Sequence, residues 1–481
     1  MNKTLLEEAY NPDQFRDMGY QLIDELSTYL GECLKGGGEW PANSWRTPAD
    51  AFLRWQIPVQ EQGGKDTAMA VLRATLQEGV HLHHPKYMGH QISPPLPVTA
   101  LAGLLSDWMN NGMGVYEMGI PGTTMERVVI QKVAQQMGYG PAADGYFTSG
   151  GTLANLTALL AARSLKAKGN TWQEGHQGSL ALVVSEDAHY CVDRAVRIMG
   201  WGEKGIIKVP VNEQFQMKTE LLEPLLMEAQ AKGLEVIAVV GSACSTATGS
   251  FDNLEAIGDF CARHQLWFHV DGAHGAALVF SEKYKQVVKG IDRADSVAMD
   301  FHKMLLTPSV TTALIFKNGQ DSYQTFSQKA DYLFEKAEAE WFNLAKRTFE
   351  CTKLMLGLKA YITLAAYGTG VWEEGVTKMV DLGKTLAALI AQRPDIELAT
   401  PPACNIVCFR YHPATRVNFD LNLLNDQIRQ AILEDGAYYI VKTLLKGTLW
   451  LRTTLANPFT TEKELNGLLD KIEDLGSSLS V

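Results

Sequence analysis

The sequence predicts an α/β protein in which a mostly parallel, seven-stranded sheet is followed by a smaller C-terminal α+β domain. Between about residues 140 and 320, seven short apolar runs alternate with helix-like stretches, which is typical of a parallel sheet buried on both faces. After about residue 325 the alternation stops, and longer helical segments precede two strand-like runs. Ligands of such sheets collect at the carboxyl ends of the strands, so residues that follow the runs are candidate functional residues.

The elements follow from the hydrophobic pattern. The predicted strands of the first sheet span residues 145–148, 180–185, 206–209, 235–241, 266–270, 296–299 and 312–316. The helices predicted between them span 153–168, 219–232 and 253–264. Before the sheet, we expect an amphipathic helix over 18–34 and a loop-rich wall over 80–125. After it, we expect helices over 341–366, 371–393 and 461–475, and strands over 405–411 and 449–454.

The composition excludes several classes of protein. The chain has 481 residues and a formal net charge of -11, with no basic run, which argues against nucleic-acid binding. No run of eighteen apolar residues is present, so no membrane span is expected, and the polar, acidic start predicts no signal peptide. The seven cysteines are scattered through apolar segments, which indicates reduced thiols and a cytoplasmic location.

Two residues at predicted strand ends indicate a specific chemistry. Asp271 ends the strand 266–270, and Lys303 follows the strand 296–299 in the run DFHK. Taken singly, such an Asp is typical of a turn or helix cap, and such a Lys is typical of a solvated surface. Together they are the pair that pyridoxal phosphate (PLP) requires. The carboxylate keeps the pyridine nitrogen protonated, and the lysine holds the aldehyde as a Schiff base.

Further residues fit the phosphate and the ring of such a cofactor. In TSGGTLANL, residues 148–156, a strand leads into a helix whose N–H groups and dipole favour a phosphate, although Gly–Ser turns before helices are common. There Gly150 and Gly151 permit close approach of the backbone, and Ser149 and Thr152 offer hydroxyl donors. The other candidates are Ser245 and Thr246 after the strand 235–241, His189 as a ring that stacks on the cofactor, and His302 beside the lysine.

Four motifs then resemble one family. GYFTSGGTLANL, EDAHYCVDRA, WFHVDGAHGAA and DFHKML resemble the group II PLP-dependent decarboxylases, which include enzymes for glutamate, aromatic amino acids, cysteine sulfinate and diaminobutyrate. The resemblance extends from HPKYMGH at 84–90 to LWLRTTLANP at 449–458, and the motifs are most similar to bacterial L-2,4-diaminobutyrate decarboxylases. It implies PLP fold-type I, the aspartate aminotransferase-like fold.

The resemblance assigns roles to individual residues. Lys303 matches the Schiff-base lysine, Asp271 the partner of the pyridine nitrogen, and His189 the histidine that stacks on the ring, which makes these three the predicted catalytic residues. Arg452 matches the arginine that binds the substrate α-carboxylate. With the phosphate candidates above, the predicted cofactor-binding set is Ser149, Gly150, Gly151, Thr152, His189, Thr246, Asp271, Ala273, His302 and Lys303.

The chain departs from the family pattern at three points. No tyrosine lies between Tyr332 and Tyr361, where relatives carry a flap tyrosine that donates a proton. Either Tyr332, His189 or water is the donor, or protonation is slow and side reactions compete. His274 stands where relatives often have Tyr or Trp. His90 stands where glutamate-type enzymes have a substrate-facing glutamine, which speaks against a γ-carboxylate substrate.

No metal site is expected. The histidines near residues 81–90 lie in a Pro-rich loop without carboxylate or Cys partners.

The predicted function is PLP-dependent decarboxylation of an L-amino acid to its amine and CO₂. L-2,4-diaminobutyrate is one candidate substrate, and an acidic or aromatic amino acid is the alternative. The rival classes are an aminotransferase, another PLP carbon–carbon lyase, and a binding protein that has lost activity. We expect a 1–110 helical and dimerisation segment, a 111–325 PLP-binding domain and a 326–481 small domain. The resemblance implies a homodimer with a shared active site, in which residues near 114–118 reach across from the other subunit.

Overall fold

The computed structural model describes residues 4–55, 64–176, 178–326, 340–413 and 420–479. The chain forms two compact units. Unit 1 consists of residues 1–90, 388–397 and 409–481, and unit 2 consists of residues 91–387 and 398–408. Three of the four boundaries between the units fall within α14 (Gly370–Ile390), β8 (Ile396–Leu398) and β9 (Ile406–Tyr411), and the fourth lies between His90 and Gln91.

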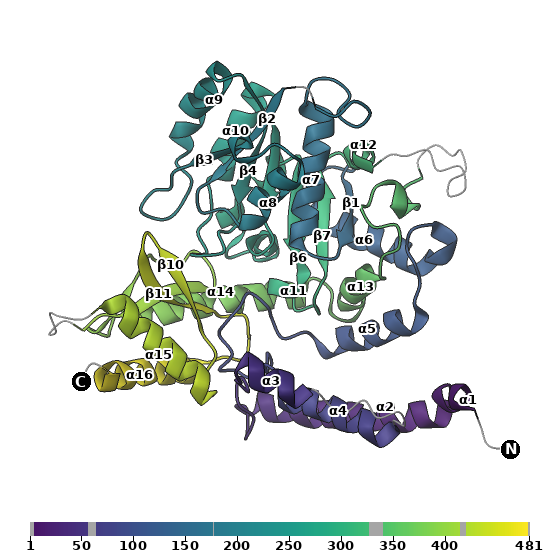
Figure 1. Ribbon diagram of the computed structural model, residues 1–481, viewed down its shortest axis with the longest axis vertical. Coiled ribbons are helices and arrows are strands. Elements are labelled where there is room, and N and C mark those ends of the chain that lie inside the picture. Colours follow the sequence, from purple (N-terminus) through teal and green to yellow (C-terminus); the bar gives the residue numbers. More distant parts are fainter. Residues whose placement is uncertain (1–3, 56–63, 177, 327–339, 414–419, 480–481) are drawn as a thin grey trace. The chain divides into compact units, whose positions relative to one another are not determined.

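A seven-stranded sheet forms the centre of unit 2 (Figure 1). Its strands are β1 (Asp144–Thr148), β2 (Ser179–Ser185), β3 (Ile206–Val209), β4 (Leu234–Ser242), β5 (Trp267–Asp271), β6 (Ser296–Asp300) and β7 (Thr312–Phe316). They lie in the order β1-β7-β6-β5-β4-β2-β3. The pairs from β3 to β6 are parallel, and only those made by β7 are antiparallel. All seven predicted strands are confirmed, each within one residue at either end.

Helices flank this sheet and position its carboxyl edge. α7 (Gly151–Lys166) follows β1 and packs against β4, β5, β6 and β7. Gly150, at the turn into α7, has φ of 142°, a conformation that favours glycine. The other helices that connect the strands are α8 (Tyr190–Ile198), α9 (Leu222–Ala231), α10 (Leu254–His264) and the single turns α11 (Phe301–Met304) and α12 (Tyr323–Phe326). The helices predicted over 153–168, 219–232 and 253–264 are therefore confirmed as α7, α9 and α10.

Two predictions in unit 2 are corrected. The expected loop-rich wall over 80–125 contains α5 (Pro97–Met109) and the start of α6 (Ile120–Gln136). Each of these helices has a proline in its first turn, where the missing N–H costs no hydrogen bond, so proline there marked a helix start rather than a loop. The helix expected over 341–366 begins only at α13 (Leu356–Tyr367).

A buried ion pair holds the non-helical segment before α13. Lys353 Nζ lies 2.6 Å from Glu126 Oε1 on α6 and donates to Phe147 O on β1 at 2.7 Å. Glu126 Oε1 in turn accepts from Phe147 N at 3.0 Å. The lysine therefore ties its own segment to a helix and a strand.

We expect Lys353→Met to lower the free energy of unfolding by about 3–5 kcal/mol, because it leaves the buried Glu126 carboxylate without its cation. The control is Lys232→Met, which breaks the exposed pair with Glu228 and should change stability by less than about 1 kcal/mol. Urea denaturation of both variants measures the difference. Equal losses in the two variants would show that the buried pair contributes no more than a surface one.

Unit 1 is largely helical. It contains α1 (Leu5–Ala9), α2 (Pro12–Leu34), α3 (Pro48–Trp55), α4 (Lys65–Gln77), α15 (Leu421–Asp435) and α16 (Glu462–Leu479). The second sheet has the order β10-β11-β9-β8, with β10 at Val441–Leu445 and β11 at Thr448–Thr454. The helices predicted over 18–34, 371–393 and 461–475 and the strands over 405–411 and 449–454 are confirmed, whereas β8, β10 and α15 were not predicted.

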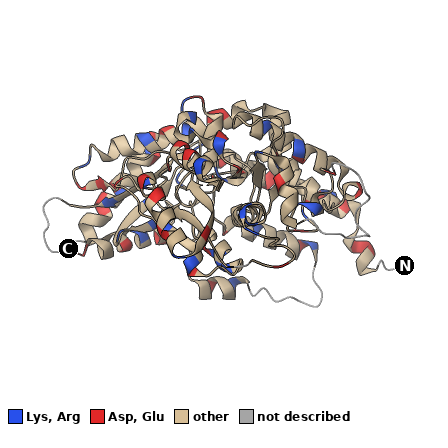
Figure 2. Cartoon of the chain, turned by 90° about the horizontal axis from the view of Figure 1, so that it is seen from above, with Lys and Arg blue, Asp and Glu red and all other residues tan. Residues whose placement is uncertain are grey.

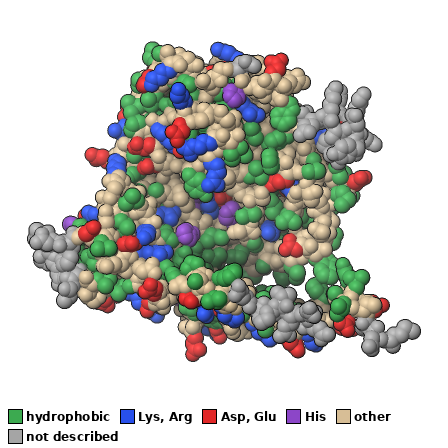
Figure 3. Space-filling view, viewed as in Figure 1, with side chains coloured by type: hydrophobic (Ala, Val, Ile, Leu, Met, Phe, Trp, Pro, Cys, Tyr) green, Lys and Arg blue, Asp and Glu red, His purple; other side chains and the backbone are tan. Residues whose placement is uncertain are grey.

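Charged residues of both signs are spread along the chain. Figure 2 shows Asp and Glu interspersed with Lys and Arg along the ribbon, and Figure 3 shows hydrophobic side chains among charged ones on one face. None of the described helices combines the length and apolar character needed to cross a bilayer.

Candidate active site

A cavity of about 200 Å³ lies in unit 2 at the carboxyl ends of β4, β5 and β6 and the start of α7. The residues that line it are Gly151, Thr152, Asn155, His189, Cys244, Thr246, Asp271, Ala273, His274, Asp300, His302 and Lys303. All three predicted catalytic residues and most of the predicted cofactor-binding residues therefore meet around one space.

Lys303 is held by an acidic partner from its own turn of helix. β6 ends at Asp300, and the single turn α11 places Lys303 Nζ 2.8 Å from Asp300 Oδ2. Burial acts to lower the pKa of Lys303, but the charge and hydrogen bond of Asp300 outweigh it and raise the pKa. The amine is therefore an ammonium when nothing is bound to it. For Asp300, burial acts to raise the pKa, but the ammonium of Lys303 and, in the acidic range where its ring is protonated, His302 outweigh it and lower the pKa.

His302 and Thr312 complete the surroundings of Asp300. Thr312 Oγ1 donates to Asp300 Oδ1 at 2.5 Å, and His302 Nε2 lies 3.6 Å from Asp300 Oδ2. His302 Nδ1 lies 3.2 Å from both the backbone nitrogen and the carbonyl oxygen of Thr311, while Nε2 is the ring nitrogen near the carboxylate. Burial lowers the pKa of His302 and keeps the ring neutral near pH 7.

Asp271 closes β5 and points into the same cavity. It is 8% exposed, and its Oδ1 accepts from the N–H of Ala273 at 3.3 Å. Cys191 Sγ lies 3.9 Å from its Oδ2. Burial raises the pKa of Cys191, so the thiol keeps its proton and can direct it at the carboxylate.

A buried hydrogen-bond network stands behind Asp271. His269 Nε2 lies 2.7 Å from Asn155 Oδ1, and Asn155 Nδ2 donates to Cys191 Sγ at 3.3 Å. On its other side, His269 Nδ1 lies 2.9 Å from Ser296 Oγ. If His269 donates from Nε2, Asn155 then donates to Cys191 and Cys191 donates to Asp271, so each bond of the network directs a donor towards Asp271.

Burial lowers the pKa of His269 to about 4, and this shift gives the protein a pH-dependent stability. In the unfolded chain the ring binds its proton near pH 6.5, so between about pH 4 and 6.5 the unfolded state holds more protons than the folded one. Stability is therefore complete above pH 6.5 and is lost as the pH falls. We expect His269 alone to account for a loss of roughly 2 kcal/mol between about pH 7.5 and about pH 5.

Urea denaturation at those two pH values checks this. His269→Gln should be less stable than the wild type near neutral pH but should lose less stability on acidification. Gln230→Ala, at an exposed position of α9, is the control; it removes no titrating group and should keep the wild-type pH dependence. An unchanged pH dependence in His269→Gln would contradict the assignment.

His189 caps α8 and also lines the cavity. Its Nδ1 accepts from the N–H of Cys191 at 3.3 Å, so the neutral ring presents a proton at Nε2. Burial lowers the pKa of His189, with the neighbouring charges of Asp271 and Lys303 acting in opposite directions. The ring is therefore neutral near pH 7.

The start of α7 forms the end of the cavity suited to an anion. Gly151 and Thr152 line the cavity, and among the described residues no side chain caps the N-terminus of the helix, so its first N–H groups are available to a ligand. Two predicted residues are not among the cavity lining. Ser149 is exposed, and its hydroxyl donates to Glu350 Oε1 at 2.9 Å, while Gly150 forms the turn before the helix.

These features fit PLP. An ammonium and a carboxylate from neighbouring strand ends face one cavity, with an uncapped helix N-terminus at one side and the small residue Ala273 in the wall. Lys303 would hold the aldehyde carbon, Asp271 the ring nitrogen, and Gly151 and Thr152 the phosphate. The fold and this set of side chains define a PLP-dependent enzyme of fold-type I.

Comparison with known proteins identifies the family. Residues 56–412 match the pyridoxal-dependent decarboxylase conserved domain, so the chain belongs to that family. It is therefore a PLP-dependent carboxy-lyase that acts on an amino acid.

Relatives of similar length are named for different substrates. An aromatic-L-amino-acid decarboxylase of Bacillus atrophaeus is 26% identical and covers 98% of this chain and 97% of its own. An L-2,4-diaminobutyrate decarboxylase of Acinetobacter baumannii is also 26% identical, covering 94% and 93%. Among solved structures, the glutamate decarboxylase domain of a diaminobutyrate-pyruvate transaminase and L-2,4-diaminobutyrate decarboxylase from Vibrio parahaemolyticus is 25% identical. It superposes with a TM-score of 0.82 over 99% of this chain and 98% of its own.

The remaining predicted site residues lie elsewhere. His90 and Arg452 belong to unit 1, where Arg452 is buried on β11. There burial, followed by the positive charges of Arg452 and Arg429, lowers the pKa of His90. Tyr332, a candidate proton donor, lies outside the described residues.

Four residues of the cavity lining were not predicted as site residues, namely Asn155, Cys244, His274 and Asp300. A signal existed for two of them. Asp300 stands three positions before Lys303, and Asn155 stands four positions after Gly151, so each shares a helical face with a predicted residue.

Proposed function

We propose that the enzyme converts L-2,4-diaminobutyrate to its amine and CO₂. The observation that carries the PLP chemistry is the meeting of Lys303 and Asp271 in one cavity, and the match of residues 56–412 to the pyridoxal-dependent decarboxylase domain supports decarboxylation. When bound, PLP supplies a conjugated ring that accepts the electron pair left at Cα as the carboxylate leaves.

The protein's own groups would support that step from fixed positions. Lys303, held at 2.8 Å by Asp300, would hold the cofactor through its amine. Asp271, backed by Cys191, would keep a proton on the ring nitrogen. His189 holds a proton at Nε2 and is one donor that could return it to Cα, beside Tyr332 and water.

The choice of substrate rests on two points. A relative named L-2,4-diaminobutyrate decarboxylase from Rhizobium meliloti is 29% identical and covers 88% of this chain. His90 also replaces the glutamine of glutamate-type enzymes. An aromatic substrate is supported by the 26% identical relative from Bacillus atrophaeus.

One observation favours an acidic substrate instead. In unit 1, the positive charges of Arg452 and Arg429 both help to lower the pKa of His90. Within the part of the chain that the structure describes, Arg429 Nε is buried without a hydrogen-bond partner. If Arg452 binds the α-carboxylate, Arg429 could bind a second carboxylate or a sulfinate.

The test is CO₂ release by the PLP-loaded protein from separate L-amino acids: diaminobutyrate, ornithine, lysine, glutamate, aspartate, cysteine sulfinate, tyrosine and tryptophan. We expect diaminobutyrate to be decarboxylated with the highest kcat/KM. If aspartate or cysteine sulfinate is preferred and Arg429→Gln raises its KM, the acidic alternative holds. If no amino acid releases CO₂, the proposed function is wrong.

We also propose a cytoplasmic homodimer with a shared active site. α5 exposes Leu101, Leu104, Leu105, Trp108 and Met109, an apolar face of the kind that interfaces cover. All seven cysteines lie in the described residues, and none forms a disulfide, which suits a reducing compartment. Sedimentation equilibrium tests the dimer, and a monomer at micromolar concentration would exclude it.

The division of the chain into the domains 1–110, 111–325 and 326–481 stays a prediction.

A further inference from the structure

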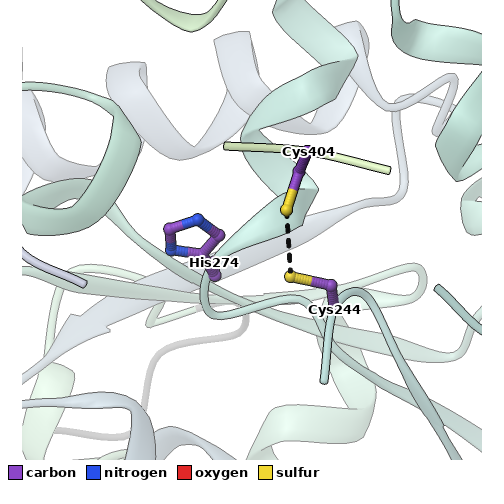
Figure 4. A group of neighbouring side chains, drawn as sticks. All are labelled: Cys244, His274 and Cys404. Atoms are coloured by element: carbon purple, nitrogen blue, oxygen red, sulfur yellow. Dashed lines mark hydrogen bonds between the residues drawn. The ribbon is translucent and has the colours of Figure 1, made fainter. Parts of the chain in front are cut away.

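Three residues with metal-binding side chains meet beside the cavity in unit 2. Cys244 follows β4, His274 follows β5, and Cys404 precedes β9 (Figure 4). None of them has a role in the decarboxylation described above. All three are buried, at 8%, 2% and 0% exposure respectively.

The spacing of their ligand atoms suits a tetrahedral ion. The two Sγ atoms lie 3.9 Å apart, and the two sulfurs and an imidazole nitrogen all lie within 4.8 Å of one another. A zinc ion with Zn–S bonds of about 2.3 Å places two thiolate sulfurs about 3.8 Å apart at the tetrahedral angle. Little movement of the two cysteines is therefore needed to bind it.

The imidazole is oriented by a neighbouring residue. His274 Nε2 lies 2.7 Å from the Oδ1 atom of Asn405, which is itself fully buried. Among the described residues, His274 Nδ1 is buried and has no hydrogen-bond partner. A ring with one nitrogen held by a carbonyl oxygen and a lone pair on the other is the usual form of a metal-binding histidine.

The charge of this donor set suits a divalent cation. Two thiolates and a neutral imidazole around a divalent cation carry no net charge, which limits the cost of burying the ion.

We propose that Cys244, His274 and Cys404 bind a thiophilic divalent cation of the zinc class, with water in the fourth position. Cys244 and His274 also line the active-site cavity, so the ion would border the space where the cofactor and substrate bind. Binding releases the two thiol protons, including the one that Cys404 directs at Gly249 O. The ion would link the segment 398–408 to the ends of β4 and β5 and stabilise unit 2.

The test is zinc binding by the PLP-loaded protein after chelator treatment and reduction, followed by elemental analysis and titration with Zn²⁺ alone. We expect one high-affinity zinc per chain, a higher melting temperature with zinc, and protection of Cys244 and Cys404 from alkylation. Cys404→Ser should weaken binding by at least about 10- to 100-fold, the loss that even a change behind the ligands causes. The matched control, Cys261→Ser, removes a buried thiol outside the cluster and should bind zinc as the wild type does.

The alkylation measurement uses the wild-type protein, so it holds even if Cys404→Ser does not fold. The proposal is wrong if reduced wild-type protein binds no more zinc than Cys404→Ser, or if zinc leaves both cysteines open to alkylation. A Cys244–Cys404 disulfide in the purified protein, with no zinc bound after its reduction, would show a thiol pair rather than a metal site.

Discussion

Lys303→Ala is expected to reduce CO₂ release by at least about 1,000-fold, because the described lining of the cavity then has no amine to hold the cofactor covalently. The same change leaves Asp300 buried without the ammonium 2.8 Å away, so part of any loss could come from altered folding. Lys303→Arg separates the two effects, since it keeps a cation opposite Asp300 but cannot form the covalent bond.

The measurement is CO₂ release together with the absorbance of protein-bound PLP. Both Lys303 variants should lack the absorbance of the covalent cofactor and should be inactive, while Lys303→Arg keeps the wild-type melting temperature. Lys289→Ala, an exposed lysine in a surface ion pair, is the control and should have wild-type activity. Activity within tenfold of the wild type in Lys303→Arg would contradict the role given to Lys303.

Asp271→Asn is expected to reduce kcat by at least about 100-fold, since an amide cannot keep the ring nitrogen protonated and so removes the charge that stabilises the transition state. The amide has nearly the same shape, so the cofactor should still bind to Lys303. The loss should therefore fall on kcat more than on cofactor occupancy, which distinguishes a role in the reaction from a structural one.

Asp259→Asn is the control for Asp271→Asn, because it neutralises an exposed carboxylate in α10, away from the cavity. It should leave kcat unchanged. Cys191→Ala tests the support behind Asp271 and should have a smaller effect, because the carboxylate remains. If Asp271→Asn retains wild-type kcat with the cofactor bound, the partner of the ring nitrogen is another residue.

The strands of the first sheet could be predicted because each is an apolar run buried on both faces, as β5 and β6 are. The proline-led helices α5 and α6 could not be recognised in the same way, since proline has two meanings, a loop or a first helical turn. The segment before α13 was predicted as a helix from its hydrophobic pattern. In the structure, the contact of Lys353 with Glu126 holds this segment, and no local pattern reveals that contact.

The candidate site likewise contains residues that the sequence could predict and residues that it could not. Asp271, His189 and Lys303 could be predicted because each follows a strand and the ends of parallel strands share one edge. The His269 network and the cluster of Cys244, His274 and Cys404 join residues far apart in the sequence. No sequence spacing indicates either group of residues. The sequence analysis therefore expected no metal site, whereas the structure brings three potential ligands together.

The most direct test of the central claim is the balance of products from an L-amino acid labelled at its carboxyl carbon. The PLP-loaded enzyme, given its best substrate without an added keto acid, should release labelled CO₂ and the corresponding amine in equal amounts. Accumulation of a keto acid, or loss of the substrate without labelled CO₂, would contradict the assignment as a decarboxylase.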